Sequence, residues 1–104
     1  LKNTPVVFQQ QYPGSKSANH LCVIRVPKRD LLQKFLKQKG IESGVYYPYA
    51  VHIQPAFLKF VILKKLPVTE SLSKETLAIP MHPNLSASDQ DFVISTIKKF
   101  YKND

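Results

Sequence analysis

One continuous apolar run, Leu21–Val26, constrains the fold of this chain more than any other segment. It is short, rich in β-branched residues and closed by Pro27, which is typical of a buried β-strand. The apolar residues of 31–36 recur at helical spacing while lysines occupy the opposite face, so an amphipathic helix is expected to follow. Gly40 supplies the left-handed residue that ends such a helix. The chain therefore contains a strand followed closely by a helix.

Three further apolar runs of β type are predicted to be strands. Val6–Phe8 is expected at a sheet edge, and a polar loop with a Pro-Gly turn follows it. Val45–Tyr47 and Leu77–Ile79 are each stopped by a proline. Because successive side chains of a strand alternate between faces, one of Tyr46 and Tyr47 is expected to lie in the core.

Two more helices are predicted in the second half of the chain. Pro67 suits the first turn of a helix that runs through Glu75. Ser86 followed by Asp89 resembles a capping box with Asp in place of Glu or Gln. It opens an amphipathic helix whose apolar face carries Val93, Ile97, Phe100 and Tyr101. The elements together predict a two-layer α/β (α+β) fold, a short and mostly antiparallel sheet with three helices, in one domain of residues 1–104.

The charge is strongly basic, with fifteen Lys and Arg against seven Asp and Glu and a net charge of +8. Such an excess attracts phosphate, nucleic acid or an acidic membrane surface. However, thirteen of the fifteen are lysines, and a nucleic-acid surface usually shows clustered Arg with interleaved aromatics. We therefore expect solvated lysine faces and no nucleic-acid partner, with an independent basic binding module as the alternative. The densest groups are Lys34, Lys37 and Lys39, and Lys98, Lys99 and Lys102.

The remaining composition excludes several classes of protein. Cys22 is the one cysteine and lies in an apolar run, so a buried structural thiol is expected and an internal disulfide is excluded. No apolar run approaches the roughly 20 residues of a membrane span, which predicts a soluble cytoplasmic protein. The three histidines are widely spaced, without the partners that a metal site requires. The sequence opens at Leu1, which suggests a piece of a longer protein or a processed form.

Three stretches, taken in order, resemble the DegT/DnrJ/StrS family of sugar-nucleotide aminotransferases, which depend on pyridoxal phosphate (PLP). The first looks like the family's strand, helix and glycine stop. The second resembles its segment G-(I/V)-x-Y-P-x-x-x-H-x-Q-P, with the spacing intact, and the third looks like its FP-x-(T/A)-E run before the last helix. The resemblance covers roughly residues 18 to 102. The three stretches are His20–Arg25 with Lys28–Leu32 and Lys37–Ile41, then Gly44–Phe57, then Leu66–Glu70 with Leu77–Leu85.

The resemblance implies the C-terminal small domain of a fold-type-I PLP enzyme. Such enzymes move an amino group from glutamate or glutamine onto a keto sugar linked to a nucleoside diphosphate, in nucleotide-sugar and cell-surface polysaccharide biosynthesis. Their large domain holds the Schiff-base lysine, the Asp on the pyridine nitrogen and the phosphate cup. None of these is recognisable here, because Gly14-Ser15-Lys16 is expected to be a surface turn and three glycines leave no Gly-rich loop. We expect no cofactor site or catalytic residue in this chain, PLP in the full-length enzyme, and no reaction by the chain alone.

The same resemblance places the second stretch at the mouth of the active site. The candidate substrate-binding residues are Tyr46, Tyr47, His52 and Gln54. Phenol, imidazole and amide groups on a proline-braced loop can hydrogen-bond to sugar hydroxyls or a diphosphate. Many family members carry His at the position of Tyr46, which bears on the sugar preference. The alternative is that His52 and Gln54 only shape the loop.

The implied partners are the large PLP-binding domain of the same enzyme and a nucleotide-sugar substrate. An isolated copy of such a small domain is expected to expose an apolar patch and to self-associate as a homodimer. The sequence does not decide whether the chain is a domain fragment, a truncated remnant or a separate subunit. A structural or interaction domain without catalysis is a further alternative.

Overall fold

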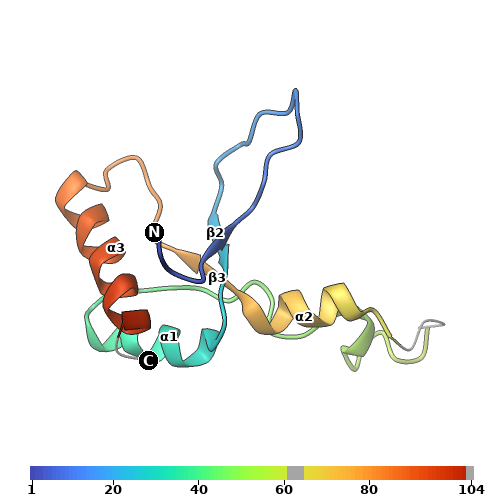
Figure 1. The fold of residues 1–104 in the computed structure, drawn as a ribbon. Coiled ribbons are helices and arrows are strands. Elements are labelled where there is room, and N and C mark those ends of the chain that lie inside the picture. Colours follow the sequence, from blue (N-terminus) through green and yellow to red (C-terminus); the bar gives the residue numbers. More distant parts are fainter. Residues whose placement is uncertain (61–64, 103–104) are drawn as a thin grey trace.

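A three-stranded antiparallel sheet in the order β1-β2-β3 lies at the centre of the computed structural model, which describes residues 1–60 and 65–102 (Figure 1). Cys22 pairs with Ile79 and Arg25 with Thr76, so β2 is hydrogen-bonded to β3 along its whole length. The strands predicted at 21–26, 6–8 and 77–79 are thus confirmed, with the first of them in the middle of the sheet. The strands are β1 Val7–Phe8, β2 Cys22–Arg25 and β3 Thr76–Ile79.

Two of the three α-helices of the described residues pack side by side on one face of this sheet (Figure 1). They are α1 Arg29–Gln38 and α3 Ala87–Lys102, while α2 Pro67–Glu75 lies away from them. The predicted two-layer fold with three helices is confirmed. The core fills the space between the two layers, and its buried side chains are Ile24, Val26, Leu32, Leu36, Ile41, Leu77, Val93 and Ile97.

The helix ends follow the signals in the sequence. Gly40 adopts φ 75°, a left-handed conformation that a residue with a Cβ rarely takes. Pro67 is the first residue of α2, where its missing N–H costs no hydrogen bond. Ser86 Oγ accepts the Asp89 N–H at 3.1 Å and donates to Asp89 Oδ2 at 2.6 Å. The predicted cap therefore forms, and the Asp89 carboxylate accepts a hydrogen bond from the Ser86 hydroxyl.

The strand predicted at Val45–Tyr47 is wrong. Only Gly44 pairs with the sheet, exchanging both backbone hydrogen bonds with Ala78 in an isolated bridge. The chain has left the sheet before it reaches Pro48, which has no N–H to donate to a strand ladder. The expectation that one of Tyr46 and Tyr47 lies in the core also fails, because both side chains are more than half exposed and no strand alternates them.

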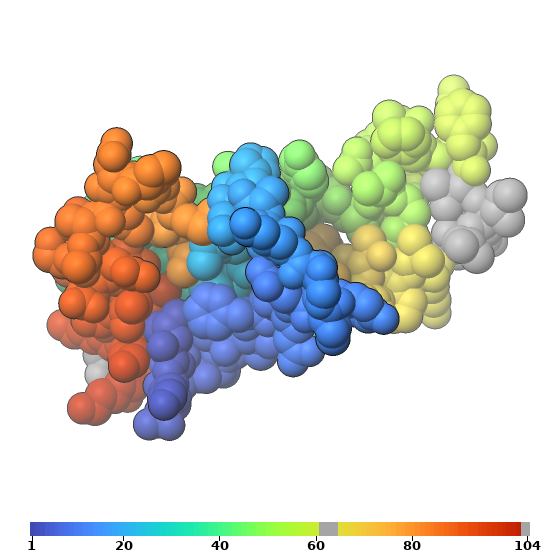
Figure 2. Space-filling model, turned by 90° about the horizontal axis from the view of Figure 1, so that it is seen from above, coloured from blue at the N-terminus to red at the C-terminus, as the bar shows by residue number. Residues whose placement is uncertain are grey.

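Two segments project from this core and give the molecule its elongated outline of 48 × 36 × 24 Å. One is the loop 9–21 between β1 and β2, and the other, here called the arm, consists of residues 51–60 together with α2 (Figures 1 and 2). The Cα radius of gyration is 15.7 Å, against about 13 Å for a compact chain of this size. No residue of α2 is buried. The arm therefore packs little on the core.

The lysines follow the expectation from composition. All six members of the two groups are exposed, on α1 and directly after it and on α3. Within the ranges 1–60 and 65–102, no helix is long and apolar enough to cross a membrane. Cys22 is half-buried rather than buried, and this partial burial raises the pKa of its thiol.

Candidate functional site

The segment with the predicted site residues begins where the chain leaves the sheet at Gly44. It passes Pro48 and enters η1, one turn of 3₁₀-helix at Val51–Ile53. The Ile53 N–H donates to the Ala50 carbonyl at 3.1 Å, and the Phe57 N–H donates to the Gln54 carbonyl at 2.9 Å. Two consecutive turns therefore determine the backbone path of residues 50–57, where the chain enters the arm.

Tyr46 and Tyr47 lie next to each other on the surface. Their ring centroids are 6.0 Å apart with an interplanar angle of 83°, an edge-to-face pair. Tyr46 is 54% exposed and Tyr47 is 71% exposed. The Tyr46 ring also folds over Gly44, where an added Cβ would lie 2.5 Å from it. The structure thus presents two phenols together to solvent, the arrangement that a hydrogen-bonding contact needs.

His52 has a different environment. The residue is 7% exposed, and its Nε2 lies 3.0 Å from Glu70 Oε1 on α2. The same carboxylate oxygen accepts the Leu66 N–H at 2.9 Å. The hydrogen bond from Leu66, and then that from His52, lowers the pKa of Glu70. The structure therefore places His52 against α2 rather than in solvent.

Gln54 is half-buried directly after η1, and its backbone N–H donates to the Val51 carbonyl at 3.2 Å. Its place in the turn is that of a loop-shaping residue, and a substrate contact for it stays a prediction. Glu70 is the residue of this region that was missed as a site residue. It lies within the stretch Leu66–Glu70 that carries the family resemblance, so the sequence identifies this carboxylate but not its contact with His52.

A second polar cluster fixes the other end of α2 to the sheet. The Arg25 guanidinium of β2 contacts the Glu75 carboxylate through Nε and donates to Ser71 Oγ at 3.2 Å. The hydrogen bond from Arg25 is the main cause that lowers the pKa of Glu75. The nearly buried Arg29 donates to the Thr76 carbonyl at 2.9 Å and so joins α1 to β3. Both arginines are explained by these structural contacts.

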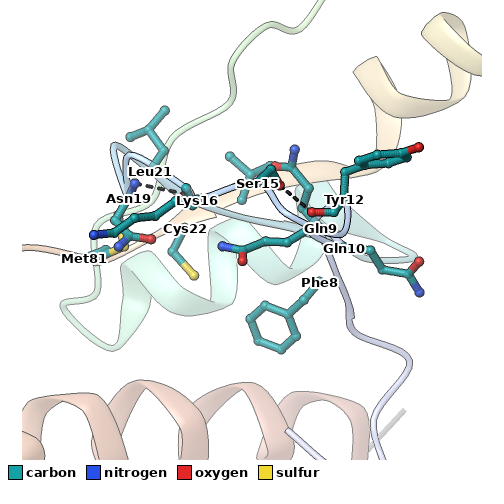
Figure 3. Close-up of a pocket in the computed structure, with 13 residues that line it drawn as sticks. Phe8, Gln9, Gln10, Tyr12, Ser15, Lys16, Asn19, Leu21, Cys22 and Met81 are labelled. Atoms are coloured by element: carbon teal, nitrogen blue, oxygen red, sulfur yellow. Dashed lines mark hydrogen bonds between the residues drawn. The ribbon is translucent and has the colours of Figure 1, made fainter.

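A cavity of about 450 Å³ opens under the projecting loop 9–21 (Figure 3). Amide side chains such as Gln9 and Asn19 line it together with the apolar Phe8 and Met81. Ser15 caps the loop's turn, with its N–H donating to the Tyr12 carbonyl at 3.0 Å, as expected of a surface turn. None of the predicted site residues lines this cavity.

Lys16, Lys34 and Lys37 line two surface cavities whose other residues do not fit PLP. The cofactor needs a lysine amine for the Schiff base and a carboxylate or comparable group at its pyridine nitrogen. In the cavity under the loop, Lys16 is accompanied by amides and hydroxyls but by no carboxylate. Lys34 and Lys37 share a surface cavity of about 330 Å³ with Glu42, yet all three are exposed. Within the described residues, no three His, Cys, Asp or Glu side chains group as metal ligands do.

Several apolar side chains are exposed on the arm, and others line a cavity beside the sheet. A cavity of about 370 Å³ lies between the sheet and α2, lined by Val7, Val23 and Leu72 among others. The exposed apolar side chains of the arm include Val51, Ile53, Phe57, Leu58, Phe60 and Val68. Several apolar side chains are thus exposed on one segment, and the contiguous apolar patch expected from the resemblance, which would mark an interaction site, stays a prediction.

Comparison with known proteins identifies the group to which these features belong. The DegT/DnrJ/EryC1/StrS aminotransferase family matches residues 1–98. A pleiotropic regulatory protein of Geobacillus stearothermophilus is 40% identical over 99 residues, which are 94% of this chain and 27% of that protein. A dTDP-3-amino-3,4,6-trideoxy-alpha-D-glucose transaminase of Micromonospora megalomicea is 33% identical over 83% of this chain and 24% of its own length.

Solved structures agree with the sequence relatives. A DegT DnrJ EryC1 StrS aminotransferase from Brucella abortus is 38% identical, with a TM-score of 0.85 over 93% of this chain and 26% of that chain. The chain therefore spans about a quarter of the length of the proteins that it matches.

Proposed function

Because the chain belongs to the DegT/DnrJ/EryC1/StrS aminotransferase family, we propose that it is the C-terminal small domain of a PLP-dependent sugar-nucleotide aminotransferase. The observation that carries the proposal is the match of nearly the whole chain to about a quarter of each relative. In this proposal the large domain binds PLP, which supplies the electron sink for amino transfer. The small domain supplies substrate contacts and helps to close the site. A role in polysaccharide biosynthesis and a cytoplasmic location stay predictions from the sequence.

The exposed apolar surface supports the proposed partner. An isolated domain of this size seldom leaves Phe57, Phe60 and Leu72 all exposed, because their burial stabilises a folded chain by about 25 cal/mol per Å². We infer that the large domain covers the arm in the intact enzyme. Without that domain, the same surface would favour association of two copies of the chain.

The exposed tyrosine pair supports a substrate contact. Tyr46 and Tyr47 are exposed side by side in the segment that leads into the arm, whose surface we assign to the large domain. Phenols are suited to donate to the hydroxyl or phosphate oxygens of a nucleotide sugar. For His52 we propose a role through the position of this segment, since its imidazole is engaged by Glu70. Gln54 remains a candidate for an amide contact.

The test begins with the cofactor. We would incubate the purified chain with PLP, reduce it with borohydride and map the labelled lysines by mass spectrometry. The expected result is weak labelling spread over several exposed lysines. The longer enzyme that contains this chain should instead be labelled at one lysine outside residues 1–104. Stoichiometric labelling of a single lysine within the chain would contradict the proposal.

A second test addresses the substrate. In the longer enzyme, Tyr47→Phe should raise KM for the keto-sugar nucleotide by about tenfold, the loss expected for one hydrogen bond to a charged or desolvated group. Tyr12→Phe is a matched control, because Tyr12 is 82% exposed on the loop 9–21. Equal effects of the two variants would remove Tyr47 from the site.

A further inference from the structure

The hydrogen bond between His52 and Glu70 joins η1 to α2. Nε2 and Oε1 are 3.0 Å apart, and His52 as a whole is 7% exposed. Oε1 is also the atom that accepts the Leu66 N–H at the start of α2. One carboxylate oxygen therefore receives hydrogen bonds from a backbone group of α2 and from the side chain of the preceding segment.

This geometry determines which ring nitrogen of the histidine must carry a hydrogen. An ionised carboxylate can only accept hydrogen bonds, so the hydrogen must be on Nε2. In the neutral imidazole the lone pair then lies on Nδ1. Nδ1 is buried and has no hydrogen-bond partner within the described residues. The Glu70 contact is thus the interaction that orients this ring.

The position of His52 matters for the residues before it. Ala50 is 3% exposed, and its carbonyl accepts the Ile53 N–H. The backbone turn that contains His52 is therefore closed by a hydrogen bond between the residues on either side of Val51 and His52. Tyr47 lies five residues before His52, with Pro48 between them to restrict the backbone. A ring held against α2 therefore limits where the tyrosine pair can lie.

We propose that Glu70 is a positioning residue, which holds His52 in the Nε2–H tautomer and thereby fixes the segment 46–54 for its substrate contact. The inference rests on the proposed function, because that function gives the segment a substrate to meet. The competing explanation is that Glu70 only caps α2 through the Leu66 N–H. A cap alone would stabilise the helix without setting the tautomer of His52.

The first experiment measures the tautomer directly on the ¹⁵N-labelled chain. Two-bond ¹H–¹⁵N correlation spectra separate the Nε2–H, Nδ1–H and doubly protonated forms of a histidine, and His52→Gln assigns the signals. We expect the Nε2–H form in the wild type and in Glu70→Gln, whose amide oxygen can still accept. Glu70→Ala should give a mixture of forms. Glu75→Ala is the matched control, because it removes a carboxylate from the same helix and should leave the His52 signals unchanged.

Two results would overturn the positioning role at this stage. One is a wild-type His52 in the Nδ1–H form, and the other is an unchanged spectrum in Glu70→Ala. If Glu70→Ala does not fold, the Nδ1–H form in Glu70→Gln would be equally decisive, since that variant keeps the volume and the acceptor of the wild type.

The second experiment uses the longer enzyme and separates binding from chemistry. Glu70→Ala should raise KM for the keto-sugar nucleotide by about tenfold while kcat falls less than about threefold. Glu70→Gln should keep KM close to the wild-type value, because its amide oxygen can still accept the hydrogen bond from His52. A fall in kcat alone, or the same KM change in Glu75→Ala, would refute the positioning role. An enzyme that accepts no sugar nucleotide would refute the proposed function itself, whereas the spectra of the chain would still report the His52–Glu70 contact.

Discussion

Two leucines on α1 provide a quantitative test of the fold. Leu36 is fully buried in the core cluster between the helices and the sheet, whereas Leu31 on the same helix is 55% exposed. Truncation of a buried leucine to alanine removes its transfer free energy and leaves a cavity, at a cost of roughly 2 to 5 kcal/mol. Truncation of the exposed leucine should cost less than about 1 kcal/mol, because alanine also favours helix. We therefore expect Leu36→Ala to destabilise the chain by about 3 kcal/mol.

Circular dichroism during thermal and urea unfolding would measure this difference. A loss of about 3 kcal/mol lowers Tm by roughly 12 to 24 °C in a domain of this size. Leu31→Ala is the matched control, with the same substitution in the same helix. If both variants lower Tm equally, or if Leu31→Ala lowers it more, the assignment of the buried face of α1 is wrong.

Three further predictions concern the acid dependence, the thiol and a helix cap. Arg25 lowers the pKa of Glu75 in the folded chain, so the stabilisation by this carboxylate is present above its ordinary pKa of 4.5 and is lost as the pH falls through the folded value. The urea midpoint should therefore decline less between neutral pH and about pH 3 in Glu75→Gln than in the wild type. An unchanged decline would contradict this. Burial raises the pKa of Cys22, so iodoacetamide should react more slowly with the folded chain than with the chain in urea at the same pH, and equal rates would argue against it. Ser86→Ala should cost about 1 kcal/mol in urea unfolding through loss of the α3 cap, while Ser95→Ala within α3 should cost less.

The sequence predicts the elements of this fold where the signal is local. The apolar run 21–26, the helical spacing of 31–36 and Gly40 are each properties of a few adjacent residues, and each gives the expected structure. Val45–Tyr47 has the same β-type composition, yet it forms no strand, because a strand also needs a partner along its length. Ala78 offers that partner to Gly44 alone. Strand pairing is a tertiary property, and composition does not contain it.

In the candidate site, too, local sequence predicts one part and tertiary contacts determine the other. The resemblance to the family identifies the segment of Tyr46 and His52, but their surroundings depend on contacts from elsewhere in the chain. His52 and Glu70 are 18 residues apart in the sequence, and they meet because η1 lies beside α2 in the folded chain. A histidine expected to face a substrate is therefore found against a carboxylate that no local pattern connects with it.

The construction of the arm explains why its partner matters for the proposed function. α2 has no buried residue, and the polar contacts Arg25–Glu75 and His52–Glu70 hold it at its two ends. Both carboxylates are accessible to solvent, so these contacts contribute less than the burial of a few large apolar side chains. The apolar surface left exposed on the arm therefore supplies the larger free energy once it is covered. We therefore expect the tyrosine pair to be positioned fully only when the large domain is in place, so that hydrogen exchange of the backbone amides at 46–54 should be slower in the longer enzyme than in the chain alone.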